Sequence, residues 1–121
     1  MPQKPILTDS IVAAGAITKK RFVGFNYAQA SAAGQLVLGV ADYEASAAGK
    51  QVSVHILGTA EVEAGAAFAA GTELMTDAQG RAVTRVGANA LGVARALQAA
   101  GAAGQVVEVL LLPARSPAPA A

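Results

Sequence analysis

The sequence predicts a mainly β protein: a small β-barrel or sandwich with one or two short helical turns and extended N- and C-terminal arms. Three observations support this prediction. The 13 glycines are spread along the whole chain and separate short valine-rich runs, and turn signals at such spacing are typical of all-β sandwiches and barrels. Residues 51–57 and 105–112 alternate with the period of two that a β-strand requires. A motif pair also recurs in the second half of the chain.

Eight runs are predicted as strands. In residues 51–57, Val52, Val54 and Ile56 share one face and His55 lies on the other. Residues 105–112 are apolar on nearly both faces, as expected of a central strand or of one covered by a neighbouring subunit. Residues 77–80 read as a hairpin loop, in which Gly80 can adopt the left-handed conformation. The predicted strands are 21–26, 36–40, 51–57, 59–63, 73–76, 81–86, 91–95 and 105–112.

Alanine-rich segments and the two termini complete the predicted organisation. Alanine is the best helix former, so residues 27–33 and 95–103 could each form one or two helical turns or remain loops. Residues 1–10 are predicted to be an extended N-terminal arm, because its prolines favour extended backbone and block regular pairing. Residues 11–112 form the β-rich core domain. Residues 113–121, mostly Pro and Ala, are expected to be a disordered tail.

An internal repeat is visible in the core. The sequence Leu-Gly-Val-Ala occurs at 38–41 and again at 91–94, and Ala-Ala-Gly occurs at 47–49 and again at 102–104. Both copies of Ala-Ala-Gly lead into a strand in which valine alternates with other residues. Two copies are too few for a solenoid, so we expect a barrel or sandwich built from two similar halves.

Composition bounds the function. At 121 residues the chain has room for one domain. Charged residues are 14% of the chain with a net charge of +1, and no basic stripe marks a nucleic-acid partner. No segment resembles a signal peptide or a membrane span, so a soluble protein made in the cytoplasm is expected. Aromatic residues, which usually bury the largest area in a core, are only 4% of the chain. The core of a single chain is therefore expected to be thin, which favours further burial against other subunits.

No arrangement of residues points to catalysis, a metal or a cofactor. His55 is the single histidine and cysteine is absent, so no imidazole or thiolate cluster can form, and His55 is expected at a surface or interface. Ser53 could contact His55 on one strand face, but neither an orienting acid nor an oxyanion hole is evident. Glu61 and Glu63 share an exposed strand face. Residues 65–71 lack the Gly-Lys-Ser/Thr of a phosphate loop.

The rings of Phe22 and Phe25 follow a basic run, Lys19-Lys20-Arg21, which is interpreted as a solvated surface segment. Such an arrangement could stack single-stranded bases, but a core position is expected for both rings. We therefore expect no enzyme, no cofactor, no membrane contact and no small-molecule substrate.

The order of small motifs from residue 21 onward resembles the tailed-bacteriophage capsid decoration (cement) proteins, a family first described as a domain of unknown function. The resemblance covers about three quarters of the chain. The residues that carry it are 21–23, 38–41, 48–49 with 52–54, 58–65, 69–74, 76–83, 91–97 and 107–109.

The resemblance implies a compact β-domain that binds the outer surface of the phage head, as a homotrimer, and clamps neighbouring major capsid subunits after the shell expands. It implies a location in the virion after assembly in the host cytoplasm. Because extended arms can pair with capsid strands, the N-terminal arm is expected to order on the capsid. The residues expected to bind the capsid are Pro2, Lys4, Pro5, Ile6 and Leu7.

Two alternatives remain open. The chain could be another phage virion or tail component, or a bacterial surface β-domain, without forming trimers on a shell. It could also be a small carrier or enzyme-associated barrel. Lys50, which follows Gly49 at a predicted turn, would then be the modified lysine, although the usual flanking residues are missing.

Overall fold

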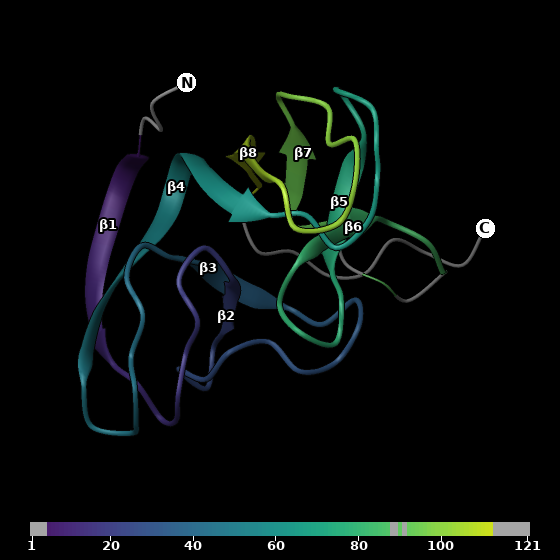
Figure 1. Ribbon diagram of the computed structural model, residues 1–121. Coiled ribbons are helices and arrows are strands. Elements are labelled where there is room, and N and C mark those ends of the chain that lie inside the picture. The colour runs from purple at the N-terminus through teal and green to yellow at the C-terminus, as the bar shows by residue number, and fades with distance from the viewer. Residues whose placement is uncertain (1–4, 88–89, 91, 113–121) are drawn as a thin grey trace.

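The computed structural model describes residues 5–87, 90 and 92–112 and consists of β-strands and connecting turns (Figure 1). The mainly β, small-barrel prediction is confirmed. The eight strands of the described residues are β1 (Pro5–Val12), β2 (Phe22–Gly24), β3 (Val37–Ala41), β4 (Gln51–Glu63), β5 (Glu73–Thr76), β6 (Ala82–Thr84), β7 (Ala94–Ala96) and β8 (Val106–Leu111).

All the strand pairs are antiparallel, and the long strand β4 is their common member. The order along the sheet is β2-β3-β4-β8-β7-β5-β6, and β1 also pairs with β4. The first part of β4 lies between β1 and β3, whereas its last part pairs with β8. The strands β4, β8, β7, β5 and β6 follow one another in the sheet. A bridge between Ala64, just after β4, and Ala82 of β6 brings the two ends of this series together. The result is a nearly closed barrel.

The predicted helical turns are wrong. Residues 27–33 and 95–103 form turns, bends and short strand pieces. Tertiary pairing overrides the propensity of alanine here. Ala30 N donates to Phe22 O, and residues 94–96 form β7 between β5 and β8. The predicted strands 51–57 and 59–63 are one strand, because the chain continues through Gly58 at a φ of 96°.

The N-terminal segment pairs with β4 from Pro5 onward, where its prolines were expected to block regular pairing. Residues 5–12 form β1, which is antiparallel to β4 with register shifts between Pro5 and Leu7 and between Leu7 and Thr8. Pro5 is the first residue of the strand, a position where a missing amide hydrogen is tolerated. The hairpin of residues 77–80 is confirmed: it joins β5 to β6, and Gly80 has a φ of 79°.

The two-fold repeat is visible in matched backbone hydrogen bonds. Ile17 and Ala45 bond to each other in both directions, and so do Phe68 and Ala100. Two further sets of bonds match. Ala13 N donates to Lys50 O as Ala64 N donates to Gln105 O, and Lys20 N donates to Ala41 O as Gly71 N donates to Ala96 O. Residues 5–57 and 59–112 are therefore two copies of one unit, here called the first and second halves.

In one place, the residues that match in their hydrogen bonds are not the residues that match in sequence. Asp42 N bonds to Ser53 O, and its counterpart is the bond from Leu97 N to Glu108 O. The Leu-Gly-Val-Ala motif at 38–41 therefore corresponds to residues 93–96, two positions beyond its sequence repeat. The Ala-Ala-Gly motifs do correspond, because Gly49 and Gly104 have φ angles of 90° and 93° and occupy matching bonds.

Two hydrophobic clusters form the core, and β2 and β3 separate them. Neighbouring strand residues point to opposite faces, so Phe22 and Val40 enter one cluster while Val23 and Ala41 enter the other. The larger cluster fills the barrel of the second half, and the smaller one lies beneath β1 and the start of β4. Both halves thus depend on the short strand β2.

Candidate interaction surfaces

The polar side chains of the described residues are spread over the domain. Among them, no group of three or more His, Cys, Asp or Glu side chains could hold a metal ion. In the same part of the chain, no helix has the length and apolar character needed to cross a membrane.

His55 is buried, which contradicts the expected surface or interface position. It does point away from Val54, but it is only 5% exposed. Its Nδ1 lies 2.9 Å from Oγ1 of Thr8 on β1, and its Nε2 lies 3.4 Å from Oδ1 of Asp42 without hydrogen-bond geometry. The sequence could not reveal this burial, because it depends on Thr8 and Asp42, which are distant in the chain and lie beside His55 in the fold. His55 thus ties β1 to the domain.

Lys20 and Arg21 are not a freely solvated run. Lys20 Nζ lies 3.2 Å from Asp42 Oδ1 and 3.4 Å from Glu61 Oε1. Arg21 Nε lies 3.0 Å from Glu63 Oε1. Glu61 and Glu63, which were expected on an exposed strand face, instead hold the segment before β2 against β4.

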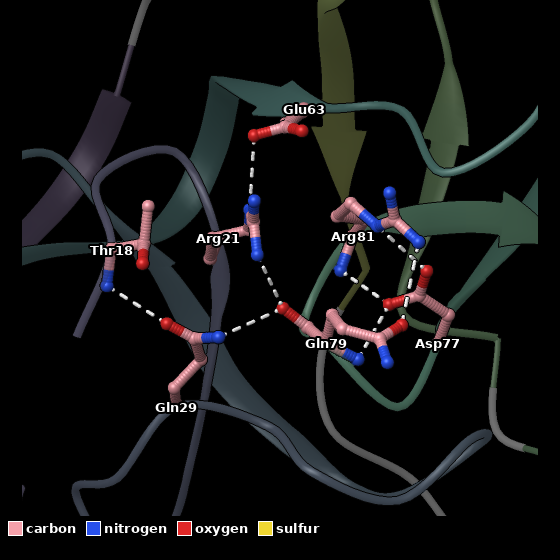
Figure 2. Close-up of polar contacts among 7 residues, drawn as sticks. All are labelled: Thr18, Arg21, Gln29, Glu63, Asp77, Gln79 and Arg81. Carbon is pink, nitrogen blue, oxygen red and sulfur yellow. Dashed lines mark hydrogen bonds and ion pairs between the residues drawn. The ribbon is translucent and has the colours of Figure 1, made fainter. Parts of the chain in front are cut away.

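Arg21 is also the centre of a polar network that joins the two halves (Figure 2). Its Nη1 donates to Gln79 O at 2.9 Å, and Gln29 Nε2 donates to the same carbonyl at 2.9 Å. Gln29 accepts from the amide of Thr18 through Oε1. The hairpin that supplies Gln79 is held in shape from within, since Arg81 Nε pairs with Asp77 Oδ2 at 3.0 Å.

Replacing Arg21 with Ala should lower the free energy of unfolding by about 1.5–3 kcal/mol, the range for hydrogen bonds that involve a charged group. The change removes bonds to β4 and to the hairpin at once, and it leaves Glu63 part-buried without this partner. Urea unfolding measures the effect. The neighbouring exposed Lys19 provides the control, because Lys19→Ala should change stability little. Equal effects of the two changes would contradict a special role for Arg21.

Glu108 is a second buried polar group that sequence reasoning missed. It is 1% exposed, although it shares the outer face of β8 with the half-exposed Val106 and Leu110. Its Cα lies opposite that of Glu61 in the ladder, and its Oε1 has no hydrogen-bond partner among the described residues. Glu108 is therefore an internal carboxyl group of the sheet.

The residues predicted to bind the capsid lie at and before the start of β1. Pro2 and Lys4 are outside the described residues. Pro5 is placed opposite Gly58 and Leu7 opposite Leu57, and Ile6 lies at the irregularity between them. From Pro5 onward the chain belongs to β1 and continues into the regularly paired residues 8–12.

The outer edge of β1 is the longest open strand edge that we find in the described residues. β1 pairs with β4 alone and lies on one flank of the molecule (Figure 1). Such an edge presents backbone amide and carbonyl groups that can pair with another chain. Thr8, Asp9 and Ser10 are exposed along it.

Exposed apolar side chains accompany this edge on the first half. Val12 is 53% exposed, Phe25 is 51% exposed and Tyr27 is 44% exposed. The expected core position is confirmed for Phe22, which is fully buried, and is wrong for Phe25. Phe25 follows the end of β2 and lies in a turn, where strand alternation no longer determines its direction.

Comparisons with known proteins found one family and similar solved structures. The profile of a family described as phage cement protein matches residues 1–111. A similar solved structure is the head fiber gp8.5 N base in bacteriophage phi29, with a TM-score of 0.69 and 20% sequence identity. That match covers 90% of this chain and 96% of the other, and it shows a shared fold. No curated protein matches the chain.

Proposed function

The chain belongs to the phage cement protein family, and on that premise we propose that it binds the outer surface of a phage head and stabilises the expanded capsid by clamping neighbouring major capsid subunits. It is a structural protein of the phage head. The observation that carries the finer proposal is β1, an edge strand whose outer edge is open and whose first residues continue the proposed capsid-binding segment.

The geometry of β1 suits strand addition. Main-chain hydrogen bonds across an open sheet edge supply affinity, and alternate side chains supply specificity. Residues 8–12 are held against β4 by regular pairing and by the bond between Thr8 and His55. They therefore form a fixed base from which Pro2, Lys4, Pro5, Ile6 and Leu7 can bind an extended segment of the major capsid protein.

A homotrimer strengthens this binding without any new contact. Once one arm has bound, the other two act at a high effective concentration on adjacent capsid subunits. A protein that binds the expanded shell and not its precursor stabilises the expanded form by linkage. Placement on the outer surface of the virion, after assembly in the host cytoplasm, belongs to the same proposal.

Deleting residues 2–7 should abolish binding to expanded capsids while the domain stays folded. Residues 8–12 keep their pairing with β4, so the thermal unfolding temperature should change little. The measurement is co-sedimentation with purified expanded capsids that lack their decoration protein. An equal-length Gly/Ser replacement of residues 2–7 separates loss of sequence from loss of length, and deletion of residues 113–121 is the matched control.

Undiminished co-sedimentation of the deletion variant would contradict the assignment of residues 2–7. Failure of the unaltered protein to bind any expanded capsid would contradict the clamp itself and favour another place in the virion.

A further inference from the structure

We propose that copies of this chain associate head to tail, by repeating between copies the contact that already joins the two halves within each chain. The interface would lie between the end of β1 at Val12 in one copy and the turn at residues 71–72 in the next, which leaves the start of β1 free for the capsid. This inference deepens the homotrimer part of the proposed function and rests on it for the number of copies.

The contact within the chain has a backbone part and a side-chain part. Glu63, the last residue of β4, donates its amide hydrogen to Lys20 O at 2.8 Å. Its carboxylate pairs with Arg21 Nε at 3.0 Å. The outer edge of β4 in the second half is therefore covered by the turn of the first half that ends at Arg21.

Each of these two surfaces, the strand edge at Glu63 and the turn at Lys20, has a counterpart in the opposite half. Among the described residues, β1 pairs with β4 alone, so the counterpart of the strand edge is uncovered. Ala13 matches Ala64 in its bond, so Val12 is the counterpart of Glu63. Lys20 and Gly71 match in their bonds and in positive φ angles, 61° and 87°. Gly71 and Thr72 are therefore the counterparts of Lys20 and Arg21.

The amide of Val12 points outward, as the amide of Glu63 does. Successive amides in a strand point to opposite edges. The amide of Ala13 is directed towards β4, where it bonds to Lys50 O. The amide of Val12 is therefore directed to the open edge. Gly71 O accepts one bond, from Arg95 Nη1 at 2.8 Å, and a carbonyl can accept a second.

The internal contact is heterologous, which leaves one surface of each kind open. If the halves were related by a two-fold axis, Val12 would meet Gly71 in the same chain. Instead β1 and the loop between β4 and β5 lie on opposite sides of the molecule (Figure 1). A head-to-tail contact that is repeated between copies either closes a ring or continues as a filament. Three chains would give a ring of six halves.

Exposed apolar residues mark the open surface independently. Phe25 and Tyr27 lie in the turn that corresponds to the hairpin of residues 77–80. Tyr27 N donates to Gly24 O as Gly80 N donates to Asp77 O, and both Tyr27 and Gly80 have positive φ angles. That hairpin contacts the first half through Gly80 O, which accepts from Phe22 N. With Val12, these side chains expose apolar area where a neighbouring copy would cover it.

Disulfide trapping tests the arrangement directly, because the chain has no cysteine of its own. Val12→Cys and Thr72→Cys occupy the counterparts of the Glu63 and Arg21 pair. We expect the two single variants, mixed and oxidised, to form a disulfide-linked heterodimer. The double variant should form covalently closed trimers, and neither single variant should cross-link alone. Non-reducing electrophoresis and native mass spectrometry of the purified protein, without capsids, give the result.

A second pair of variants tests the interface without cross-links. Val12→Glu should reduce the oligomer fraction at least tenfold in sedimentation velocity, and adding Thr72→Arg should restore it by recreating the ion pair between Arg21 and Glu63. A monomeric unaltered protein, cross-linking of Val12→Cys with itself, or open filaments from the double cysteine variant would overturn the proposal. None of these results depends on capsid binding, so they are distinguishable from failure of the clamp.

Discussion

Replacing Phe22 with Ala is expected to lower the free energy of unfolding by about 3–5 kcal/mol, the usual cost of removing a buried phenyl ring. That is a large share of the roughly 5–15 kcal/mol that holds a typical domain together. Phe22 is fully buried and is the largest such side chain in the described residues. It comes from β2 in the first half and packs in the cluster that fills the second half.

The backbone of Phe22 makes the loss harder to absorb. Its amide donates to Gly80 O and its carbonyl accepts from Ala30 N, so it is fixed between the hairpin and the segment after β2. A residue held on both sides cannot shift to fill the cavity, and the cost of a cavity is high where the surroundings cannot collapse. We therefore expect an effect near the upper end of the range.

Phe25→Ala is the matched control, because it removes the same ring three residues later from an exposed position. Urea unfolding should be measured at a protein concentration low enough to keep the chains separate, so that self-association does not contribute. Similar losses for the two variants would mean that the halves are not locked together through Phe22.

The strand pattern could be predicted from the sequence because its signals are local. The period-two runs at 51–57 and 105–112 and the loop at 77–80 each determine their own conformation. Segments 73–76 and 106–111 form strands where the sequence indicates them. The repeated Ala-Ala-Gly motif predicts two similar halves, because Gly49 and Gly104 are needed for the same left-handed turn.

What the sequence could not show depends on pairing between distant segments. The burial of His55 follows from β1 lying beside it. The strand β1 was not predicted, because Pro5 indicates an unpaired segment. The predicted helical turns failed because residues 94–96 gain more from pairing with β5 and β8 than from alanine helix propensity. Local sequence records none of these long-range contacts.

The candidate surface was predicted only in part. The N-terminal position of Pro5, Ile6 and Leu7 beside an open strand edge is compatible with the expected capsid contact, which stays a prediction. The self-association surface around Val12 was not predicted at all. It becomes visible only when the hydrogen bonds of the two halves are compared, because the residues at its matching positions are chemically different.

Gly39→Ala should destabilise the fold by about 1–3 kcal/mol, the range for overpacking a filled site, with a larger loss expected if the strands cannot separate. A Cβ on Gly39 would collide with the backbone carbonyl of His55 and come within 3.0 Å of Val54 Cγ1. A carbonyl in the middle of β4 cannot rotate away as a side chain can. Relief therefore requires β3 to move from β4, which disturbs the pairing of Val40 with His55.

Gly15→Ala is the control for this substitution, because the added methyl group would meet no atom within 4 Å. Its effect should be neutral or stabilising by up to about 1 kcal/mol, through the lower entropy of the unfolded chain. Thermal unfolding compares the two variants. Hydrogen exchange at the amides of residues 51–57 should then be faster in Gly39→Ala alone, since the β3–β4 pairing is what the methyl group disrupts. Unchanged exchange there, together with unchanged stability, would show that β3 and β4 lie farther apart than the close contact at Gly39 requires.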